Sequence, residues 1–225
     1  MFYGAGHREQ VPATPLKRGL FITFEGIDGA GKSTHVAWSA DFLRGRGVAL
    51  TLTREPGGTV LGEKLRELLL TAQGNIHAET EALLMFSARR QHLEEIIRPA
   101  LMRRDCVLCD RFTDASFAYQ GGGRGVDKKK LAALATWVHP DLEPDLTVLF
   151  DVSAQVGQGR VARIKSPDRF ERENVEFFVR VRDAYLERMK ESPHRFVRID
   201  GTGPIPAIQE ELGKTLTMAL SKWKA

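Results

Sequence analysis

The sequence has few of the features that mark secreted and membrane proteins. Its 225 residues include only two cysteines, Cys106 and Cys109, which are too few for a disulfide framework. No run approaches the roughly 18 to 20 apolar residues of a membrane-spanning helix. Residues 1–10 carry Arg8 and Glu9 without an apolar run behind them, unlike a secretory signal. From these absences we expect a cytoplasmic protein that does not bind a membrane.

Other absences limit the kind of fold and site. The chain has no internal repeat or low-complexity block, and its six histidines show no metal-ligand spacing. Hydrophobic residues make up 42% of the chain and charged residues 28%, as in ordinary globular proteins of one domain. Cys106 and Cys109 lie inside one apolar run with no second ligand pair nearby, so we interpret both thiols as packed core groups.

What the sequence does contain is an alternation of short apolar runs with longer helical patterns. Apolar strands separated by helices are typical of a parallel sheet with helices on both faces, so we predict a three-layer α/β/α fold with five parallel strands. Residues 1–19 have neither apolar period and predict a flexible extension before a domain over residues 20–225. The expected strands are 20–25, 48–53, 106–110, 146–151 and 196–200, and the expected helices are 32–46, 60–72, 79–103 with a kink or stop at Pro99, 127–138, 153–164, 171–190 and 205–222.

A phosphate-binding loop follows the first predicted strand. Residues 26–33 fit the pattern G-x-x-x-x-G-K-[ST], in which glycines let backbone N–H groups turn inward and the next helix directs its positive end at the same point. Lys32 adds an ammonium for the terminal phosphates, and Ser33 is placed to bind Mg²⁺. The pattern indicates a nucleoside triphosphate site without distinguishing kinases from other P-loop proteins. The expected binding residues are Gly26, Ile27, Asp28, Gly29, Ala30, Gly31, Lys32, Ser33 and Thr34.

Two further polar segments follow predicted strands, where open α/β sheets bind ligands. Asp110 ends one strand and precedes Arg111, and a P-loop protein needs such a carboxylate to organise Mg²⁺ for phosphoryl transfer. Arg54 follows another strand within residues 53–59, where Pro56 and two glycines predict a tight turn that can hold a cis peptide. A surface Asp-Arg pair and a plain turn are the alternatives at this point.

A stripe on the long predicted helix has two interpretations. Phe86, Arg90, Leu93 and Ile97 recur at i, i+4, i+7 and i+11, so they share one face. The stripe can be core, with the Arg90 stem lying along it. Alternatively, the ring and the guanidinium can stack on a nucleobase and bind its edge.

In their order along the chain, the motifs resemble the signatures of the thymidylate kinase family. The most specific is Asp110-Arg111-Phe112 followed by Ala118-Tyr119-Gln120-Gly121-Gly122-Gly123-Arg124, which other nucleoside monophosphate kinases lack. The resemblance implies a nucleoside monophosphate kinase-like P-loop fold and transfer of the ATP γ-phosphoryl group to dTMP with Mg²⁺, giving dTDP and ADP for dTTP synthesis. Members are commonly homodimers. The matching segments are residues 24–34, 53–59, 84–90, 110–112, 118–124 and 168–171.

The resemblance also implies roles for individual side chains. Thymine would stack on Phe86 and accept from Arg90 through O4, with Gln120 along its edge. Tyr119 would close on the sugar C2′, and Asp28 would accept from the 3′-hydroxyl. The remaining expected residues are Arg54 and Arg111 at the acceptor phosphate, Ser116 in the substrate pocket, Lys32, Asp110 and Arg111 in catalysis, and Ser33 and Asp110 at Mg²⁺.

A basic segment near residues 160–172 is expected to form the lid. In this family a further catalytic arginine comes from the P-loop or from the lid, and because Gly29 follows Asp28, the lid must supply it here. We expect Arg163 in this role, with Arg169 as second candidate. The segment holds Arg160, Arg163, Lys165, Arg169 and Arg172, whereas Ala162 and Ile164 stand where related lids often carry arginine.

The charge distribution bears on the remaining alternatives. The chain has a net charge of +4 and a sequence pI near 9.2, which by itself is compatible with a nucleic-acid partner. Residues 1–19 carry +2 and residues 160–172 carry +3, which leaves −1 for the rest. We therefore expect no nucleic-acid partner, and a P-loop ATPase acting on DNA becomes the weaker alternative. A kinase for another pyrimidine nucleotide or a deoxynucleoside also stays open.

Overall fold

The computed structural model describes residues 18–72, 74–162 and 168–224 and places one parallel sheet at the centre. Its strand order is β2-β3-β1-β4-β5, and every strand pair is parallel. The predicted fold class and strand number are therefore confirmed. The strands are β1 (Phe21–Glu25), β2 (Leu50–Arg54), β3 (Cys106–Asp110), β4 (Leu146–Asp151) and β5 (Phe196–Asp200).

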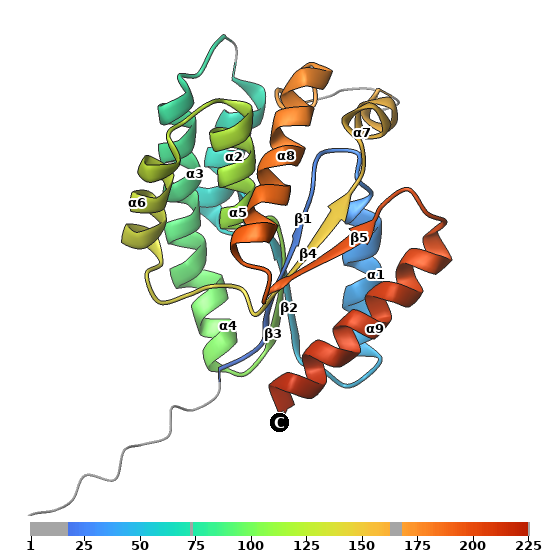
Figure 1. The fold of residues 1–225 in the computed structure, drawn as a ribbon. Coiled ribbons are helices and arrows are strands. Elements are labelled where there is room, and N and C mark those ends of the chain that lie inside the picture. The colour runs from blue at the N-terminus through green and yellow to red at the C-terminus, as the bar shows by residue number, and fades with distance from the viewer. Residues whose placement is uncertain (1–17, 73, 163–167, 225) are drawn as a thin grey trace, which may run out of the picture.

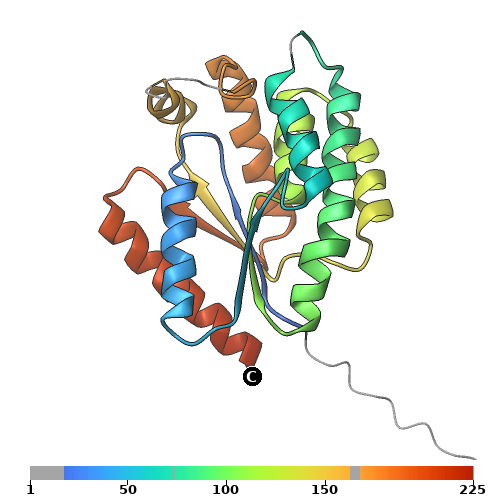
Figure 2. The same ribbon diagram turned by 180° about the vertical axis from the view of Figure 1, so that it is seen from behind.

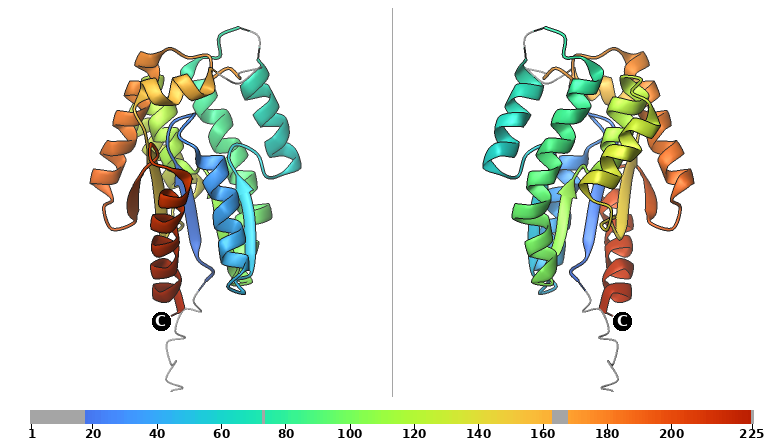
Figure 3. Two further views of the ribbon diagram at one scale, coloured as in Figure 1. Left: turned by 90° about the vertical axis from the view of Figure 1, so that its right-hand side faces the viewer. Right: turned by 90° about the vertical axis from the view of Figure 1, so that its left-hand side faces the viewer.

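Helices cover both faces of this sheet (Figure 1). Helices α1 and α9 pack together on one face, and α3, α5 and α8 lie on the other, as the reverse view also shows (Figure 2). Figure 3 shows α2 and α8 at opposite edges of the molecule. The helices are α1 (Lys32–Arg44), α2 (Val60–Thr71), α3 (Ala78–His92), α4 (Arg98–Met102), α5 (Thr113–Ser116), α6 (Lys128–Val138), α7 (Ala154–Val161), α8 (Val175–Glu191) and α9 (Ile205–Lys224), with π-helical segments η1 (Leu93–Ile97) and η2 (Phe117–Gly123).

The central strands are apolar along their whole length because both of their faces are covered. All residues of β1 and β4 are buried, and in β1 alternate side chains enter different cores. Phe21 joins one hydrophobic cluster, whereas Ile22 and Phe24 join the other. At the sheet edge, β2 is only partly buried, and 43% of Leu52 is exposed. No helix in the described parts of the chain is long and apolar enough to cross a membrane.

The predicted element boundaries need three corrections. Pro99 does not stop the long helix, which continues to Met102, because the preceding turn is the π-helical η1 and the N–H of Arg98 reaches back to the carbonyl of Leu93. Helix α8 begins at Val175 rather than at residue 171, since Asn174 caps it there. Residues 18 and 19, which we expected in a flexible extension, are placed in the fold, since the N–H of Gly19 donates to Leu101 O at 2.7 Å, whereas residues 1–17 lie outside the described residues.

Helix α5 and segment η2, which we did not predict, carry part of the substrate pocket. The glycines of η2 allow a close approach to α8: a Cβ on Gly122 would lie 2.7 Å from the carbonyl oxygen of Arg180 and 2.6 Å from Cβ of Ala184. A Cβ on Gly123 would meet the ring of Phe177 at 2.5 Å. The glycine run is therefore a packing requirement of this contact.

We predict that Gly122→Ala destabilises the fold by about 1 to 3 kcal/mol, because the added methyl group must displace helix backbone. The matched control is Gly159→Ala in α7, where nothing lies within 4 Å of the added Cβ. There we expect no loss, and a gain of up to ~1 kcal/mol, from the higher helix propensity of alanine. Urea unfolding of both variants measures the difference, and equal stabilities would contradict the packing argument.

Candidate active site

The P-loop joins β1 to α1 at the carboxyl ends of the strands. Its backbone requires glycine at Gly26, where φ is 136° and a Cβ would lie 2.4 Å from the carbonyl oxygen of Phe150. Arg160 of α7 donates to Gly29 O at 3.1 Å and to Gly201 O at 3.0 Å, so it braces the loop against the segment after β5. Ser33 lies exposed in the first turn of α1. This strand–loop–helix geometry is the one that the sequence pattern requires for binding phosphates.

Lys32 is folded into the loop. Its side chain is 7% exposed, and Nζ donates to Gly26 O at 3.0 Å and to Ile27 O at 2.9 Å. Burial, together with the nearby Arg111 guanidinium, lowers the pKa of Lys32 to about 8. A phosphate group brought to the loop would offset both effects.

Asp110 is suited to a hard divalent cation. It ends β3 beside the P-loop, and its buried Oδ1 has no hydrogen-bond partner within the described ranges. No group of three or more His, Cys, Asp or Glu side chains in those ranges could hold a metal by itself. This fits Mg²⁺, which protein sites usually hold through one or two carboxylates and the substrate phosphates. Asp110 and Ser33 are the residues that fit it here.

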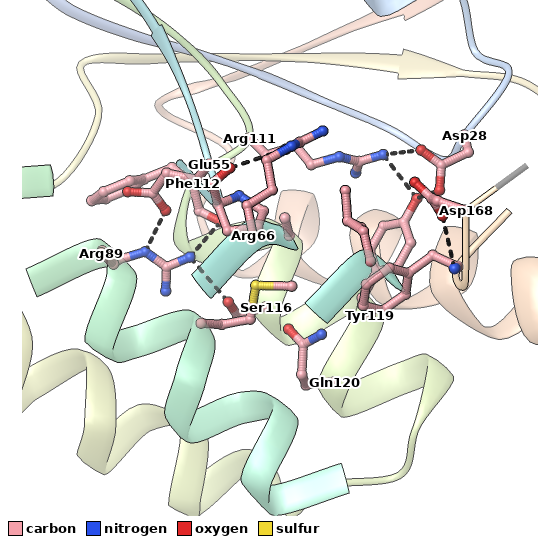
Figure 4. Close-up of a pocket in the computed structure, with 15 residues that line it drawn as sticks. Asp28, Glu55, Arg66, Arg89, Arg111, Phe112, Ser116, Tyr119, Gln120 and Asp168 are labelled. Carbon is pink, nitrogen blue, oxygen red and sulfur yellow. Dashed lines mark hydrogen bonds and ion pairs between the residues drawn. The ribbon is translucent and has the colours of Figure 1, made fainter. Parts of the chain in front are cut away.

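Arg111 connects the P-loop to the pocket beside it (Figure 4). One nitrogen of its guanidinium donates to Asp28 Oδ1 at 2.5 Å and to the Tyr119 hydroxyl at 2.9 Å. The other donates to Gly26 O at 2.9 Å and to the Tyr185 hydroxyl at 3.1 Å. Its φ of 70° is a left-handed conformation that non-glycine residues seldom adopt. Four hydrogen-bond acceptors and an unusual backbone conformation thus hold Arg111 at the centre of the site.

Two buried carboxylates near Arg111 have pKa values shifted in opposite directions. Burial favours a higher pKa for Asp28, but the charges of Arg111 and Lys32 bring this pKa below its usual value. Burial and the nearby Asp114 raise the pKa of Glu25 to about 8. The Tyr185 hydroxyl donates to Glu25 at 2.8 Å, which orients the tyrosine oxygen that accepts from Arg111.

The pocket beyond Arg111 is lined by six separate parts of the chain. Asp28 comes from the P-loop, Arg66 and Leu70 from α2, and further side chains from α3 and from the segment after β3. Figure 4 shows the amide of Gln120 at the floor, between Ser116 and Tyr119. The remaining lining residues are Glu55, Pro56, Met85, Arg89, Phe112, Ala115, Asp168 and Phe170.

Arg89 is fixed by a buried hydrogen-bond network. Its Nε donates to Glu55 at 2.7 Å, and one terminal nitrogen donates to Ser116 Oγ at 3.0 Å and to Phe112 O at 3.1 Å. Glu55 also contacts Nδ1 of buried His92 at 3.0 Å. The other terminal nitrogen of Arg89, Nη1, is buried and has no partner among the described residues. Arg89 therefore presents one free donor next to the pocket.

The resemblance implied that Phe86 and Arg90 bind the base, but neither residue lines this pocket. Phe86 is 2% exposed and belongs to a hydrophobic core, in accord with the first interpretation of the stripe. Arg90 donates to Val138 O at 3.0 Å on the other side of α3. Met85 and Arg89 also stand four residues apart, and one step along a helix rotates a side chain by about 100°, which brings this pair to the pocket instead.

Arg54 also lies outside the lining of the pocket, whereas another arginine, Arg66, lies within it. Arg54 is about half exposed and pairs with Glu63 at 2.9 Å, and Glu63 also accepts from Gly58 N at 2.8 Å. Arg54 thus stabilises the turn that contains the cis peptide before Pro56. Arg66, which the sequence reasoning missed, lines the pocket, and burial and the charge of Arg54 lower its pKa. Such an environment favours an anion beside Arg66.

Of the two candidate lid arginines, only Arg169 lies within the described residues. Arg163, our first candidate, lies outside the described residues, as do Ile164 and Lys165. The Nε of Arg169 donates to Leu69 O at 2.9 Å, and its guanidinium pairs with Glu81. Arg169 is therefore directed toward α2 and α3 and away from the P-loop. The structure does bring together Asp28, Arg111, Ser116, Tyr119 and Gln120.

Fold and site together define a P-loop phosphotransferase of the nucleotide kinase class. The P-loop and the carboxylate of Asp110 lie on one side of Arg111, and a pocket lined by Arg66, Arg89 and Gln120 lies on the other.

Comparison with known proteins identifies the family. Residues 24–212 match the family model for thymidylate kinase. The chain is 57% identical to a thymidylate kinase of Methylobacillus flagellatus over 87% of this chain and 95% of that protein. It is also 57% identical to one of Cupriavidus taiwanensis, over 88% and 98%. The crystal structure of thymidylate kinase from Ehrlichia chaffeensis superposes with a TM-score of 0.72 at 38% identity, covering 88% of this chain and 99% of that one. The chain belongs to the thymidylate kinase family.

We predict that Arg66→Gln weakens dTMP binding by roughly tenfold or more, because a charged hydrogen bond to phosphate is lost. Arg54→Gln should weaken it less, since Arg54 acts only through the turn. Calorimetric titration of dTMP compares the variants, and titration of ATP, which should not change, is the control. A larger loss in Arg54→Gln would assign the anion to Arg54 instead.

Proposed function

We propose that the protein transfers the γ-phosphoryl group of ATP to dTMP, giving dTDP and ADP, the step that leads toward dTTP. The observation that carries the proposal is a polar pair beside the pocket. Buried Arg89 Nη1 has no partner among the described residues, and Gln120 directs Nε2 at Glu81, so Oε1 is the end of its amide that faces away from Glu81.

This pair matches one edge of a pyrimidine. A donor next to an acceptor complements a ring carbonyl beside a ring N–H, which thymine and uracil present at O4 and N3. Cytosine presents an amine and a bare nitrogen there, so both contacts would be mismatched. Since a mismatch leaves buried polar groups unpaired, this edge supports strong discrimination against dCMP and less against dUMP.

The rest of the pocket suits a deoxynucleoside monophosphate. The Tyr119 hydroxyl donates to Asp28 Oδ2 at 2.8 Å, and in the proposal this ionised carboxylate would accept from the 3′-hydroxyl while the Tyr119 ring lies beneath the sugar. Arg66 and Arg111 would be the cations for the 5′-phosphate. Met85, which lines the pocket, would lie beside the base where we had expected Phe86.

Phosphoryl transfer in this site is a matter of positioning and charge. The P-loop and Lys32 would hold the donor phosphates, while Arg111 fixes the acceptor phosphate in line with them. When bound, Mg²⁺ neutralises charge on the phosphates, and Ser33 and Asp110 would hold it. The acceptor oxygen of a phosphate is already ionised, so no general base is needed. Arg163 would add the lid arginine.

A coupled assay of ADP release with dTMP, dUMP, dCMP and thymidine tests the function. We expect dTMP to be the best acceptor, dUMP to be a weaker one, and dCMP and thymidine to be poor, because dCMP has the wrong edge and thymidine lacks the phosphate. An enzyme without dTMP-dependent turnover, or one with a preference for thymidine, would contradict the proposal.

We also propose a homodimer formed through the outer face of α3 and α6. These helices border an apolar groove, and large apolar side chains at its rim are exposed: Leu83 by 53% and Trp137 by 80%. Apolar side chains gathered at one groove are typical of an interface, and a second copy fits the habit of the family.

Light scattering after gel filtration tests the dimer. We expect the unmodified protein to elute as a dimer and the variant Leu83→Glu/Trp137→Glu as a monomer, because two charges would be buried unpaired. Met102→Glu in α4 is the control, since Met102 is 82% exposed away from this groove. A dimer that survives the double substitution would place the interface elsewhere.

A further inference from the structure

A buried carboxylate behind the pocket contacts one of its lining residues, Gln120, and two arginines outside the lining. Glu81 of α3 is fully buried, with 0% of its surface exposed. Its Oε1 accepts from Nε2 of Gln120 at 2.9 Å. Its Oε2 accepts from Arg169 and lies 3.4 Å from Nε of Arg124. Glu81 does not line the pocket, so it acts on a ligand only through these neighbours.

The partners of Glu81 need an acceptor. Arg169 and Arg124 place two guanidinium groups, which can only donate, against one oxygen of Glu81, and the amide nitrogen of Gln120 lies at the other oxygen. Glu173, which pairs with Arg124 at 2.5 Å, completes a cluster of two acids and two bases. The bond to Gln120 can therefore form in one sense only, with the amide N–H₂ donating.

This one-way bond determines which end of the Gln120 amide the pocket receives. A glutamine amide can rotate by 180° and exchange its donor and acceptor ends at little steric cost. With Nε2 directed at Glu81, Oε1 is left for the ligand. Without an obligatory acceptor behind it, the same side chain could offer N–H₂ to the ligand instead.

We propose that Glu81 is a positioning residue that sets the base selectivity, by fixing Gln120 so that its acceptor faces N3 of the pyrimidine. The inference rests on the proposed function, since it concerns how the same pocket rejects cytosine. It assigns the selectivity to a side chain outside the pocket as well as to Gln120 itself.

The variant Glu81→Gln tests this assignment sharply. In it, Arg169 still requires an acceptor, so the new carboxamide oxygen should face Arg169 and its N–H₂ should face Gln120. Gln120 must then rotate and present N–H₂ to the ligand, which suits N3 of cytosine. Arg89 still opposes the cytosine amine, so selectivity should fall without reversing.

We predict that the ratio of kcat/KM for dTMP to that for dCMP falls by about tenfold or more in Glu81→Gln, the usual effect of one misplaced hydrogen bond. The dTMP to dUMP ratio should not change, because both bases present the same edge, and neither should the KM for ATP. A role in folding alone would instead lower kcat/KM for every acceptor in proportion, and an unchanged dTMP to dCMP ratio would overturn the inference.

A second pair of variants separates the loss of the acceptor from the net charge of the cluster. Arg169→Gln leaves the cluster with one extra negative charge but keeps the bond between Gln120 and Glu81, so its dTMP to dCMP ratio should stay near that of the unmodified enzyme. Glu81→Gln/Arg169→Gln differs from it only at Glu81 and keeps the cluster neutral, and its ratio should fall. Equal ratios in these two variants would also overturn the inference. The unmodified enzyme is assayed first, so a failure of dTMP turnover itself is seen separately.

Discussion

The guanidinium of Arg111 is the interaction on which the two halves of the site depend. It is the group that binds both to the P-loop, through Gly26 and Asp28, and to the acceptor pocket, through Tyr119. The backbone that presents it has a φ of 70°, and its position at the end of β3 is fixed by the sheet. Two nucleotides that repel each other can meet only where a fixed cation faces both, so the separation of the two binding sites is set by this side chain.

Buried ion pairs hold the side chains around the acceptor pocket, whereas the P-loop depends mainly on the conformation of its backbone. Glu55 with Arg89, Glu81 with Arg169 and Asp114 with Arg195 are three such pairs beneath or behind the pocket. Removing one partner of a buried pair typically costs about 3 to 5 kcal/mol, because a charge is left uncompensated. The pairs are therefore more important for holding side chains in one arrangement than for net stability. A pocket that distinguishes bases by hydrogen bonds to one edge needs this rigidity before the ligand binds.

The sequence predicted the parts that depend on short, local patterns. The parallel sheet, the P-loop and the placement of Asp110 and Arg111 follow from apolar runs and from motifs at strand ends, and the structure has them at those positions. The rotation of α3 could not be predicted, because Phe86 with Arg90 and Met85 with Arg89 have the same spacing. Only the packing of the helix decides which pair reaches the pocket.

The surroundings of Arg54, Arg66 and Arg169 could not be predicted for a related reason. The role of an arginine depends on which acids lie near it in the fold. Glu63, nine residues along the chain, forms an ion pair with Arg54, whereas Arg66 lines the pocket. Glu81, distant in sequence, draws Arg169 away from the P-loop. The basic composition of the lid segment carries no information about these partners.

The pKa of about 8 for Lys32 has a consequence for the energetics of nucleotide binding. In the empty loop near pH 8, about half of the molecules carry an uncharged amine at this position. Triphosphate favours the ammonium, so binding takes up a fraction of a proton from solution, and affinity is gained as the pH falls through 8. The heat of binding then includes the ionisation of whichever buffer supplies that proton. The loop thus exchanges protons with its surroundings each time the nucleotide enters or leaves.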